Sequence, residues 1–185
     1  MCGIAGYIGP KFIDDKTIYS CLSTMNNRGP DYQDYIRFKI NDVKVSLLHS
    51  RLAILDLDDR SNQPFSFQNC TIIFNGEIYN YIEIRNGLKK LGYNFQTTSD
   101  TEVLLKAYIE YGEDCVNYFN GMWSFAIWDD RKNKLFLSRD RFGEKPLYYF
   151  KSNDGFYFSS EVKAIQSMLP NPLNINYRQL KKYIV

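Results

Sequence analysis

A cysteine at position 2 is the first residue of this sequence that could carry out chemistry. Initiator methionine is generally removed when the next side chain is small, so Cys2 can become the N-terminal residue. It would then carry a thiol and an α-amine, whose usual pKa values are about 8.5 and about 8, so the amine can serve as the base for the thiol. The chain has one histidine, His49, so a Cys-His pair has a single candidate. Taken alone, a chance Met-Cys start explains Cys2 more simply.

The segment FNGEIYN at 74–80 is the second candidate. A short strand ending at Asn75-Gly76 and followed by a helix would place a side-chain amide and an accessible backbone N–H at the end of a sheet. Acyl transfer needs such a pair of donors to hold its tetrahedral oxyanion. A plain Asn-Gly hairpin turn is the alternative, although the residues that follow have helical rather than strand spacing.

Three charged residues complete the set. Arg51 lies within an apolar run and would need a carboxylate partner if it were buried, because guanidinium and carboxylate pair bidentately. An outward strand position or a structural ion pair would explain it equally well. Asp100 lies inside the capping box Ser99-x-x-Glu102, so its local pattern indicates a structural role at a helix start. Glu77 has the same ambiguity.

Hydrophobic patterning predicts the elements that must position these residues. Strands are expected at 3–9, 34–40, 43–49, 71–74, 122–128, 135–138, 147–150 and 156–159. Helices are expected from Asp14 or Asp15 to the turn at Gly29-Pro30, from 81 to 91, from Ser99 onward and from near Glu161. The polar stretch 56–69 reads as a loop. Strands and helices segregated in this way predict an α+β fold with two facing antiparallel sheets between helices.

Composition limits the class of protein. The 185 residues suit one domain, and 44% hydrophobic residues supply a core. The 23 basic and 21 acidic residues are spread along the chain, unlike the basic stripe of a nucleic-acid-binding protein. The four cysteines have no metal-ligand spacing. With no secretory signal and no 18-residue apolar run, the sequence predicts a soluble, cytoplasmic protein without a membrane partner.

Six segments in order resemble the glutaminase domain of the class II glutamine amidotransferases, in the asparagine synthetase branch. They are MCGIAG at 1–6, NRGPD at 27–31, HSRLAILDL at 49–57, FNGEIYN at 74–80, SDTE at 99–102 and DRFGEKPLYY at 140–149. Each is weak alone, but six in family order over the whole chain are highly specific. The resemblance implies an N-terminal-nucleophile hydrolase fold, a four-layer αββα sandwich of two antiparallel sheets.

The resemblance also implies a role for each candidate residue. Cys2 would attack the side-chain amide of L-glutamine, release ammonia and leave a glutamyl thioester for water to hydrolyse. The Asn75 side chain and the Gly76 N–H match the oxyanion hole of the family, and Arg51 matches the group that holds the α-carboxylate. Asp100 and Glu77 match positions around the α-amino group, so binding joins capping as a role for Asp100. The backbone of Leu52, Ala53, Ile54 and Leu55 would line the pocket.

Two further segments are placed by the resemblance without a catalytic role. NRGPD resembles a loop near the nucleophile, where Arg28 would support the site, and DRFGEKPLYY resembles a segment that faces the synthetase half of such enzymes. His49 matches no family role and is expected to be structural.

The sequence lacks the SGG-type ATP loop of family synthetases and any Walker-type or dinucleotide glycine loop. No cofactor is therefore expected in this chain, and ATP and Mg are expected only in a missing synthetase domain. Residues 1–170 are predicted to form the glutaminase domain. Residues 171–185, polar and without a finished element, are predicted to begin a linker toward a synthetase domain or subunit that receives the ammonia. The full enzyme could be a homodimer.

Three other functions compete with an ammonia supply for asparagine synthesis. The same glutaminase chemistry could serve another acceptor, in sugar or secondary-metabolite amidation. The chain could instead be a non-catalytic glutamine-binding module, which loss of Cys2, Arg51 or Asn75 would favour, yet all three are present. A different N-terminal-nucleophile amidase would share Cys2 but gives no reason for Arg51 and Asp100.

Overall fold

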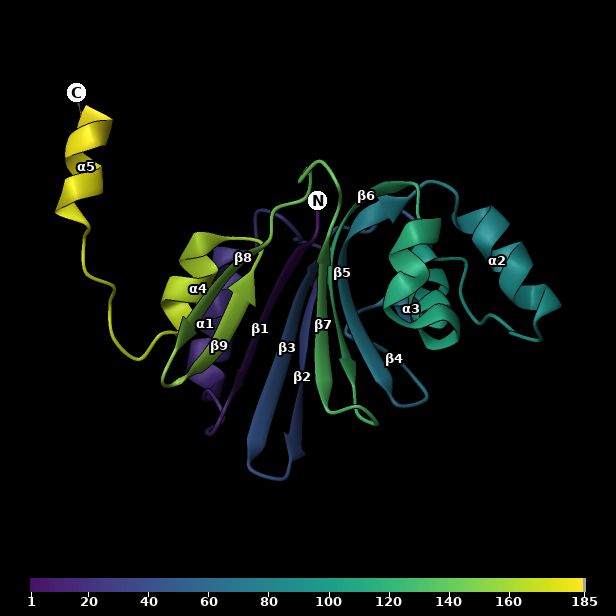
Figure 1. Cartoon of the computed structure of the whole chain (residues 1–185), viewed down its shortest axis with the longest axis horizontal. Coiled ribbons are helices and arrows are strands. Elements are labelled where there is room, and N and C mark those ends of the chain that lie inside the picture. The colour runs from purple at the N-terminus through teal and green to yellow at the C-terminus, as the bar shows by residue number, and fades with distance from the viewer. Residues whose placement is uncertain (185) are drawn as a thin grey trace.

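Two antiparallel sheets lie face to face between helices in the computed structural model, which describes residues 1–184 (Figure 1). The first sheet has the strand order β2-β3-β1-β9-β8 and the second has the order β4-β5-β6-β7. The strands are β1 (Gly3–Gly9), β2 (Tyr32–Ile40), β3 (Val43–Arg51), β4 (Phe65–Phe67), β5 (Cys70–Ile78), β6 (Gly121–Asp129), β7 (Lys134–Arg139), β8 (Tyr148–Ser152) and β9 (Gly155–Ser159).

Helices cover the outer face of each sheet. In Figure 1, α1 and α4 lie against the first sheet and α3 against the second, with α2 on the outer side of α3, while α5 stands apart at the C-terminal end. The α-helices are α1 (Asp15–Thr24), α2 (Tyr81–Lys90), α3 (Asp100–Tyr111), α4 (Val162–Met168) and α5 (Tyr177–Ile184), and the 3₁₀ helices are η1 (Asp59–Ser61) and η2 (Gly112–Tyr118). None of the helices within residues 1–184 is long and apolar enough to cross a membrane.

The core consists of three apolar clusters, one for each interface between layers. One joins α1 and α4 to the first sheet, another joins α2 and α3 to the second, and the third fills the space between the sheets. Because side chains alternate along a strand, Ile4 of β1 and Ile73 of β5 both enter the central cluster, whereas Ala5 and Phe74 face helices. The predicted α+β sandwich of four layers is confirmed.

Two details differ from the sequence prediction. The strand predicted to end at Phe74 continues to Ile78, with Asn75 opposite Ser124 and Gly76 opposite Trp123 in β6. The Asn-Gly pair therefore lies within a paired strand rather than at its end. The predicted loop 56–69 contains η1 and the short strand β4. Residues 171–185, whose linker role stays a prediction, include α5, and residue 185 lies outside the described residues.

The start of α3 also differs from the predicted capping box. Ser99 caps the helix by accepting the Thr101 N–H at 3.1 Å. Glu102 does not reach back to Ser99; its carboxylate accepts the Thr97 N–H at 2.7 Å and pairs with the buried Lys106 ammonium at 2.6 Å. Glu102 therefore forms a buried ion pair with Lys106 instead of the hydrogen bond back to Ser99 that a capping box requires.

Candidate active site

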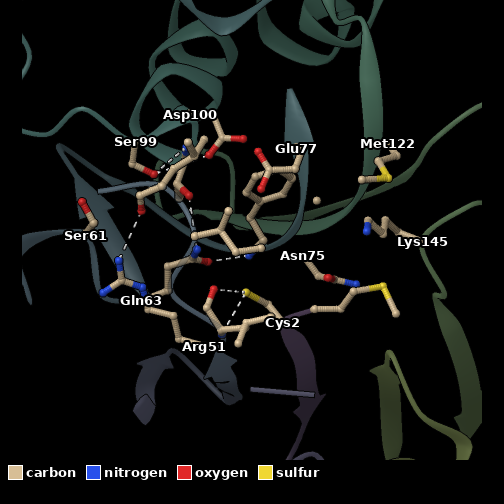
Figure 2. A pocket seen from close by; sticks show the side chains of 17 residues that line it. Cys2, Arg51, Ser61, Gln63, Asn75, Glu77, Ser99, Asp100, Met122 and Lys145 are labelled. Atoms are coloured by element: carbon tan, nitrogen blue, oxygen red, sulfur yellow. Dashed lines mark hydrogen bonds between the residues drawn. The ribbon is translucent and has the colours of Figure 1, made fainter. Parts of the chain in front are cut away.

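A pocket of about 180 Å³ opens where the N-terminus, the end of β3, β5 and the start of α3 meet (Figure 2). Most of the predicted site residues line it: Cys2, Arg51, Leu52, Ile54, Leu55, Asn75, Gly76, Glu77 and Asp100. Ala53 is the exception, because it is absent from the lining and its N–H donates to the Asp31 carboxylate at 2.8 Å. The structure thus brings together residues that the sequence separates by up to 98 positions.

Cys2 precedes β1, and strand alternation sends its side chain to the same side as Ile4, into the gap between the sheets. Its Sγ lies 3.4 Å from the Leu52 N–H and 3.6 Å from the Leu52 carbonyl oxygen. Burial raises the pKa of the Cys2 thiol above its ordinary value, although the Leu52 N–H and the charge of Arg51 oppose that rise. The thiol is therefore protonated near neutral pH and needs a base.

Arg28 holds the backbone of the nucleophile. Its Nε donates to the Cys2 carbonyl oxygen at 3.0 Å, and its Nη1 pairs with the Glu161 carboxylate at 3.1 Å. Glu161 is the N-cap residue of α4, so Arg28 connects the start of the chain to a helix near its other end. This geometry agrees with the supporting position that the NRGPD segment suggested.

Asn75 and Gly76 lie side by side on the pocket wall formed by β5. Asn75 is almost fully buried, and its Nδ2 has only a long contact of 3.4 Å to the Ser124 hydroxyl. A Cβ atom at position 76 would lie 2.3 Å from the Met122 carbonyl oxygen, so only glycine fits this place in the strand pair. Together the two residues can present an amide N–H and a backbone N–H to a developing oxyanion.

Arg51 is the last residue of β3 and is only 6% exposed. Its guanidinium donates to the Asn62 Oδ1 at 2.6 Å, to the Asp58 carbonyl oxygen at 3.3 Å and to the Asp56 carbonyl oxygen. Within residues 1–184 no carboxylate lies within ion-pair distance of it. The carboxylate partner predicted for a buried arginine is thus not supplied by this part of the chain.

Asp100 opens α3 on another wall of the pocket and is 4% exposed. Its Oδ2 accepts the Ile78 N–H at 3.0 Å. Burial, with a further contribution from the nearby charge of Glu77, raises the pKa of Asp100 to about 7, although N–H donors oppose the rise. Burial also raises the pKa of the half-buried Glu77, against the effect of Lys145. The pocket therefore has a cationic end at Arg51 and an acidic end at Asp100.

Comparison with known proteins identifies the family. The family model of a glutamine amidotransferase domain matches residues 1–185. The chain belongs to this family. The amidotransferase domain is 42% identical over 172 residues to asparagine synthetase [glutamine-hydrolyzing] 3 of Bacillus subtilis (strain 168), covering 89% of this chain and 27% of that protein. It is 39% identical to asparagine synthetase [glutamine-hydrolyzing] 1 of the same organism, covering 100% of this chain and 29% of the relative.

A plant relative agrees with this assignment, and a solved structure shares the fold. Asparagine synthetase [glutamine-hydrolyzing] of Zea mays is 36% identical, covering 89% of the chain and 28% of its own length. The chain thus spans less than a third of these curated relatives. Glutamine phosphoribosylpyrophosphate amidotransferase from B. subtilis, solved with ADP and GMP, superposes with a TM-score of 0.73 at 20% identity, over 90% of this chain and 43% of that one. This likeness supports the N-terminal-nucleophile hydrolase fold.

His49 is close in the sequence to residues that line the pocket, but it does not line the pocket itself. The ring is fully buried, and its Nε2 lies 3.1 Å from the Phe74 carbonyl oxygen, which requires Nε2 to be the donor. Burial lowers the pKa of His49 to about 3, so the ring is neutral. It has no hydrogen bond to Cys2, and the structure gives it a packing role between β3 and β5.

Several lining residues of the amidotransferase domain could not be assigned from the sequence. They are Ser61, Gln63, Phe74, Ser99, Thr101, Met122 and Lys145. Lys145 is 6% exposed and lines the pocket (Figure 2). It belongs to the DRFGEKPLYY segment, where the Asp140 carboxylate accepts hydrogen bonds from four backbone N–H groups. The sequence pattern that could have indicated the turn in this segment is the aspartate shortly before a glycine in DRFG. Within residues 1–184, no group of three or more His, Cys, Asp or Glu side chains is arranged to hold a metal.

Proposed function

We propose that this domain hydrolyses L-glutamine to glutamate and ammonia, with Cys2 as the nucleophile after removal of Met1. The observation that carries the proposal is the pair of charges that the pocket leaves unbalanced. Arg51 is a buried cation without a carboxylate partner, and Asp100 is a buried acid without a cation partner, within the described chain. Buried charges need compensation, and the α-carboxylate and α-ammonium groups of an amino acid supply both.

The side chain of the bound amino acid would then extend toward Cys2. The Cys2 α-amine accepts the thiol proton, and the sulfur attacks the carbonyl carbon of the glutamine amide. The oxygen of the tetrahedral intermediate takes the negative charge, which the Asn75 amide and the Gly76 N–H stabilise. Collapse of the intermediate breaks the C–N bond, and the protonated amine gives its proton to the leaving nitrogen as ammonia departs.

A glutamyl thioester on Cys2 remains after this half of the reaction. Water attacks the thioester carbonyl with the α-amine again acting as base, and the same two donors hold the second oxyanion. The C–S bond then breaks, glutamate leaves and the thiol recovers its proton. Burial raises the pKa of the Cys2 thiol, so the proposed mechanism requires a base to take its proton.

We further propose that the ammonia serves asparagine synthesis from aspartate, ATP and glutamine, in a longer or partnered enzyme. The names of the three relatives quoted above support asparagine synthesis. The longer or partnered enzyme is proposed because the chain matches less than a third of each of them. ATP and Mg would act in that synthetase part. With the full-length enzyme, amide-¹⁵N-glutamine, aspartate and Mg-ATP should yield ¹⁵N-asparagine. Formation of glutamate without labelled asparagine would reject this acceptor and leave the glutaminase step standing.

The glutaminase step is tested with a glutamine-analogue diazoketone followed by intact-mass and peptide mass spectrometry. The adduct is expected on Cys2 in chains that lack Met1, and Cys2→Ala should abolish both the adduct and glutamate release. Cys70→Ala is the matched control, because it removes a buried thiol that is absent from the pocket lining. An adduct elsewhere, an adduct on a chain that retains Met1, or turnover by Cys2→Ala would refute the mechanism. Glutamine binding without turnover would indicate a non-catalytic module.

A further inference from the structure

Two neighbouring amide side chains, Asn62 and Gln63, contact three walls of the pocket from the segment between η1 and β4. Gln63 is 6% exposed and lines the pocket, and Asn62 is partly buried beside it. Their polar atoms reach different partners, so the two residues act on different parts of the glutamine site. Neither of them belongs to the oxyanion hole or directly supplies a charge for the substrate.

Gln63 joins β5 to α3. The register of β4 against β5 pairs Phe65 with Ile72, and continuing it two residues further places Gln63 opposite Phe74. β4 begins at Phe65, and beyond it the Gln63 side chain bonds to β5 in place of the backbone. Its Oε1 accepts the Phe74 N–H at 2.6 Å, and its Nε2 donates to the Thr101 hydroxyl at 3.2 Å.

These two contacts of Gln63 lie next to functional groups. Phe74 immediately precedes Asn75, and Thr101 immediately follows Asp100. One buried side chain therefore sets the spacing between the strand that carries the oxyanion donors and the helix start that carries the acid. A glutamine molecule must span this spacing, with its amide at Asn75 and its α-amino group at Asp100.

Asn62 acts on the third wall. Its Oδ1 accepts a hydrogen bond from Arg51 Nη1 at 2.6 Å, and its Nδ2 donates to the Asp59 carboxylate at 3.1 Å. The amide oxygen orients the guanidinium without neutralising it. A carboxylate in its place would form a charge-assisted pair with Arg51 and compete with the carboxylate of the substrate.

We propose that Asn62 and Gln63 are positioning residues of the glutamine site. Asn62 aims Arg51 while leaving its charge available, and Gln63 holds β5 and α3 at the separation that one substrate molecule spans. The inference rests on the proposed glutaminase function and adds which residues set the geometry of the glutamine site. It predicts different kinetic effects for the two residues, which a purely structural role at the end of β4 would not produce.

Asn62→Asp gives the sharper test, because it changes charge and almost no volume. KM for glutamine should rise by about tenfold or more, as expected for a competing charged hydrogen bond, with kcat within about twofold. Asn62→Ala should raise KM less, because it removes the hydrogen bond that orients Arg51 but leaves the charge of Arg51 free to bind the substrate carboxylate. Asn69→Asp is the control, since it adds the same charge at an exposed turn next to β5. An unchanged KM in Asn62→Asp, or an equal rise in Asn69→Asp, would overturn the role of Asn62.

Gln63→Glu keeps an acceptor for the Phe74 N–H and removes the donor to Thr101. It should lower kcat/KM by about tenfold, the effect of losing one buried hydrogen bond. Gln63→Met, similar in volume, removes both contacts and should lower kcat as well, because the Asn75 strand is no longer held. Loss of thermal stability with wild-type kcat and KM in Gln63→Glu would overturn its positioning role.

The same test is repeated by calorimetry of glutamine binding in the Cys2→Ala background, where turnover plays no part. A Kd raised by about tenfold in Asn62→Asp supports the inference. Absence of binding in Cys2→Ala alone would contradict the proposed function itself. Normal binding that Asn62→Asp leaves unchanged would contradict only the positioning role.

Discussion

Replacing Asp100 with asparagine separates the two roles that its position allows. The substitution keeps an oxygen to accept the Ile78 N–H at 3.0 Å and removes the ionisable group. A capping role requires the negative charge at the start of α3, so the variant should lose stability. A substrate-binding role requires an acid held in a costly environment, so the variant should gain stability and lose affinity for glutamine.

The size of the effect follows from the pKa of Asp100, which burial raises from 3.8 to about 7. Between these two values the folded protein binds more protons than the unfolded chain, so its free energy of unfolding falls as the pH rises. The full difference corresponds to at most about 4 kcal/mol, lost above pH 7 and regained below pH 3.8. Asp100→Asn removes this dependence, so it should exceed the wild type in stability at pH 8 and match it near pH 4.

Urea unfolding at pH 4, 6 and 8 measures the difference in each protein. Ser99→Ala is the control, because it removes the helix cap and should cost about 1 kcal/mol at every pH. Glutaminase assays at pH 8 should show a raised KM for Asp100→Asn. The reasoning fails if Asp100→Asn is destabilised equally at all three pH values, or if its KM equals that of the wild type.

Substitutions at three other positions test separate parts of the site and the core. Asn75→Ala should lower kcat by about 10²–10³-fold with little change in KM, because the amide acts on the oxyanion; steady-state kinetics measures both constants. Arg51→Ala should raise KM, with a loss of ~2–5 kcal/mol in kcat/KM, and Arg51→Lys should recover little because a single ammonium lacks the planar fork. Glu102→Gln should cost about 3 kcal/mol of stability in urea unfolding, because it leaves the buried Lys106 unpaired; equal unfolding midpoints would contradict this.

Sequence periodicity located most of the elements because each half-buried strand and each amphipathic helix repeats its apolar residues at a fixed interval. It misjudged β5 because Asn-Gly is typical of a turn in isolation. In the fold, the partner strand β6 continues the ladder past Gly76, and the missing Cβ is what lets the Met122 carbonyl approach. Local pattern cannot show a partner that lies 49 residues away.

The candidate site was predictable where a residue type itself requires a partner. Cys2, Asn75 and Arg51 were candidates from their residue types and local patterns, whereas the pattern around Asp100 indicates a helix cap and only the family resemblance gave it a binding role. Gln63 was not a candidate, because a polar residue before a proline is typical of a loop. Only the register of β4 against β5 shows that the Gln63 side chain accepts the N–H of Phe74 in β5. Lys145 was missed for the same reason, since its turn enters the pocket through long-range contacts.

The placement of Cys2 favours the proposed mechanism, in which no second residue serves as the base. The thiol lies in the gap between two sheets, where burial raises its pKa, and the one histidine is buried with its Nε2 committed to the Phe74 carbonyl. An ionisable group brought in from another element would add a further desolvation cost in this space. The α-amine of Cys2 would avoid that cost, because the proposed nucleophile itself would carry it, next to the start of β1. In the proposed mechanism, removal of Met1 would both supply the base and clear space in the pocket, since Met1 is among the residues that line it.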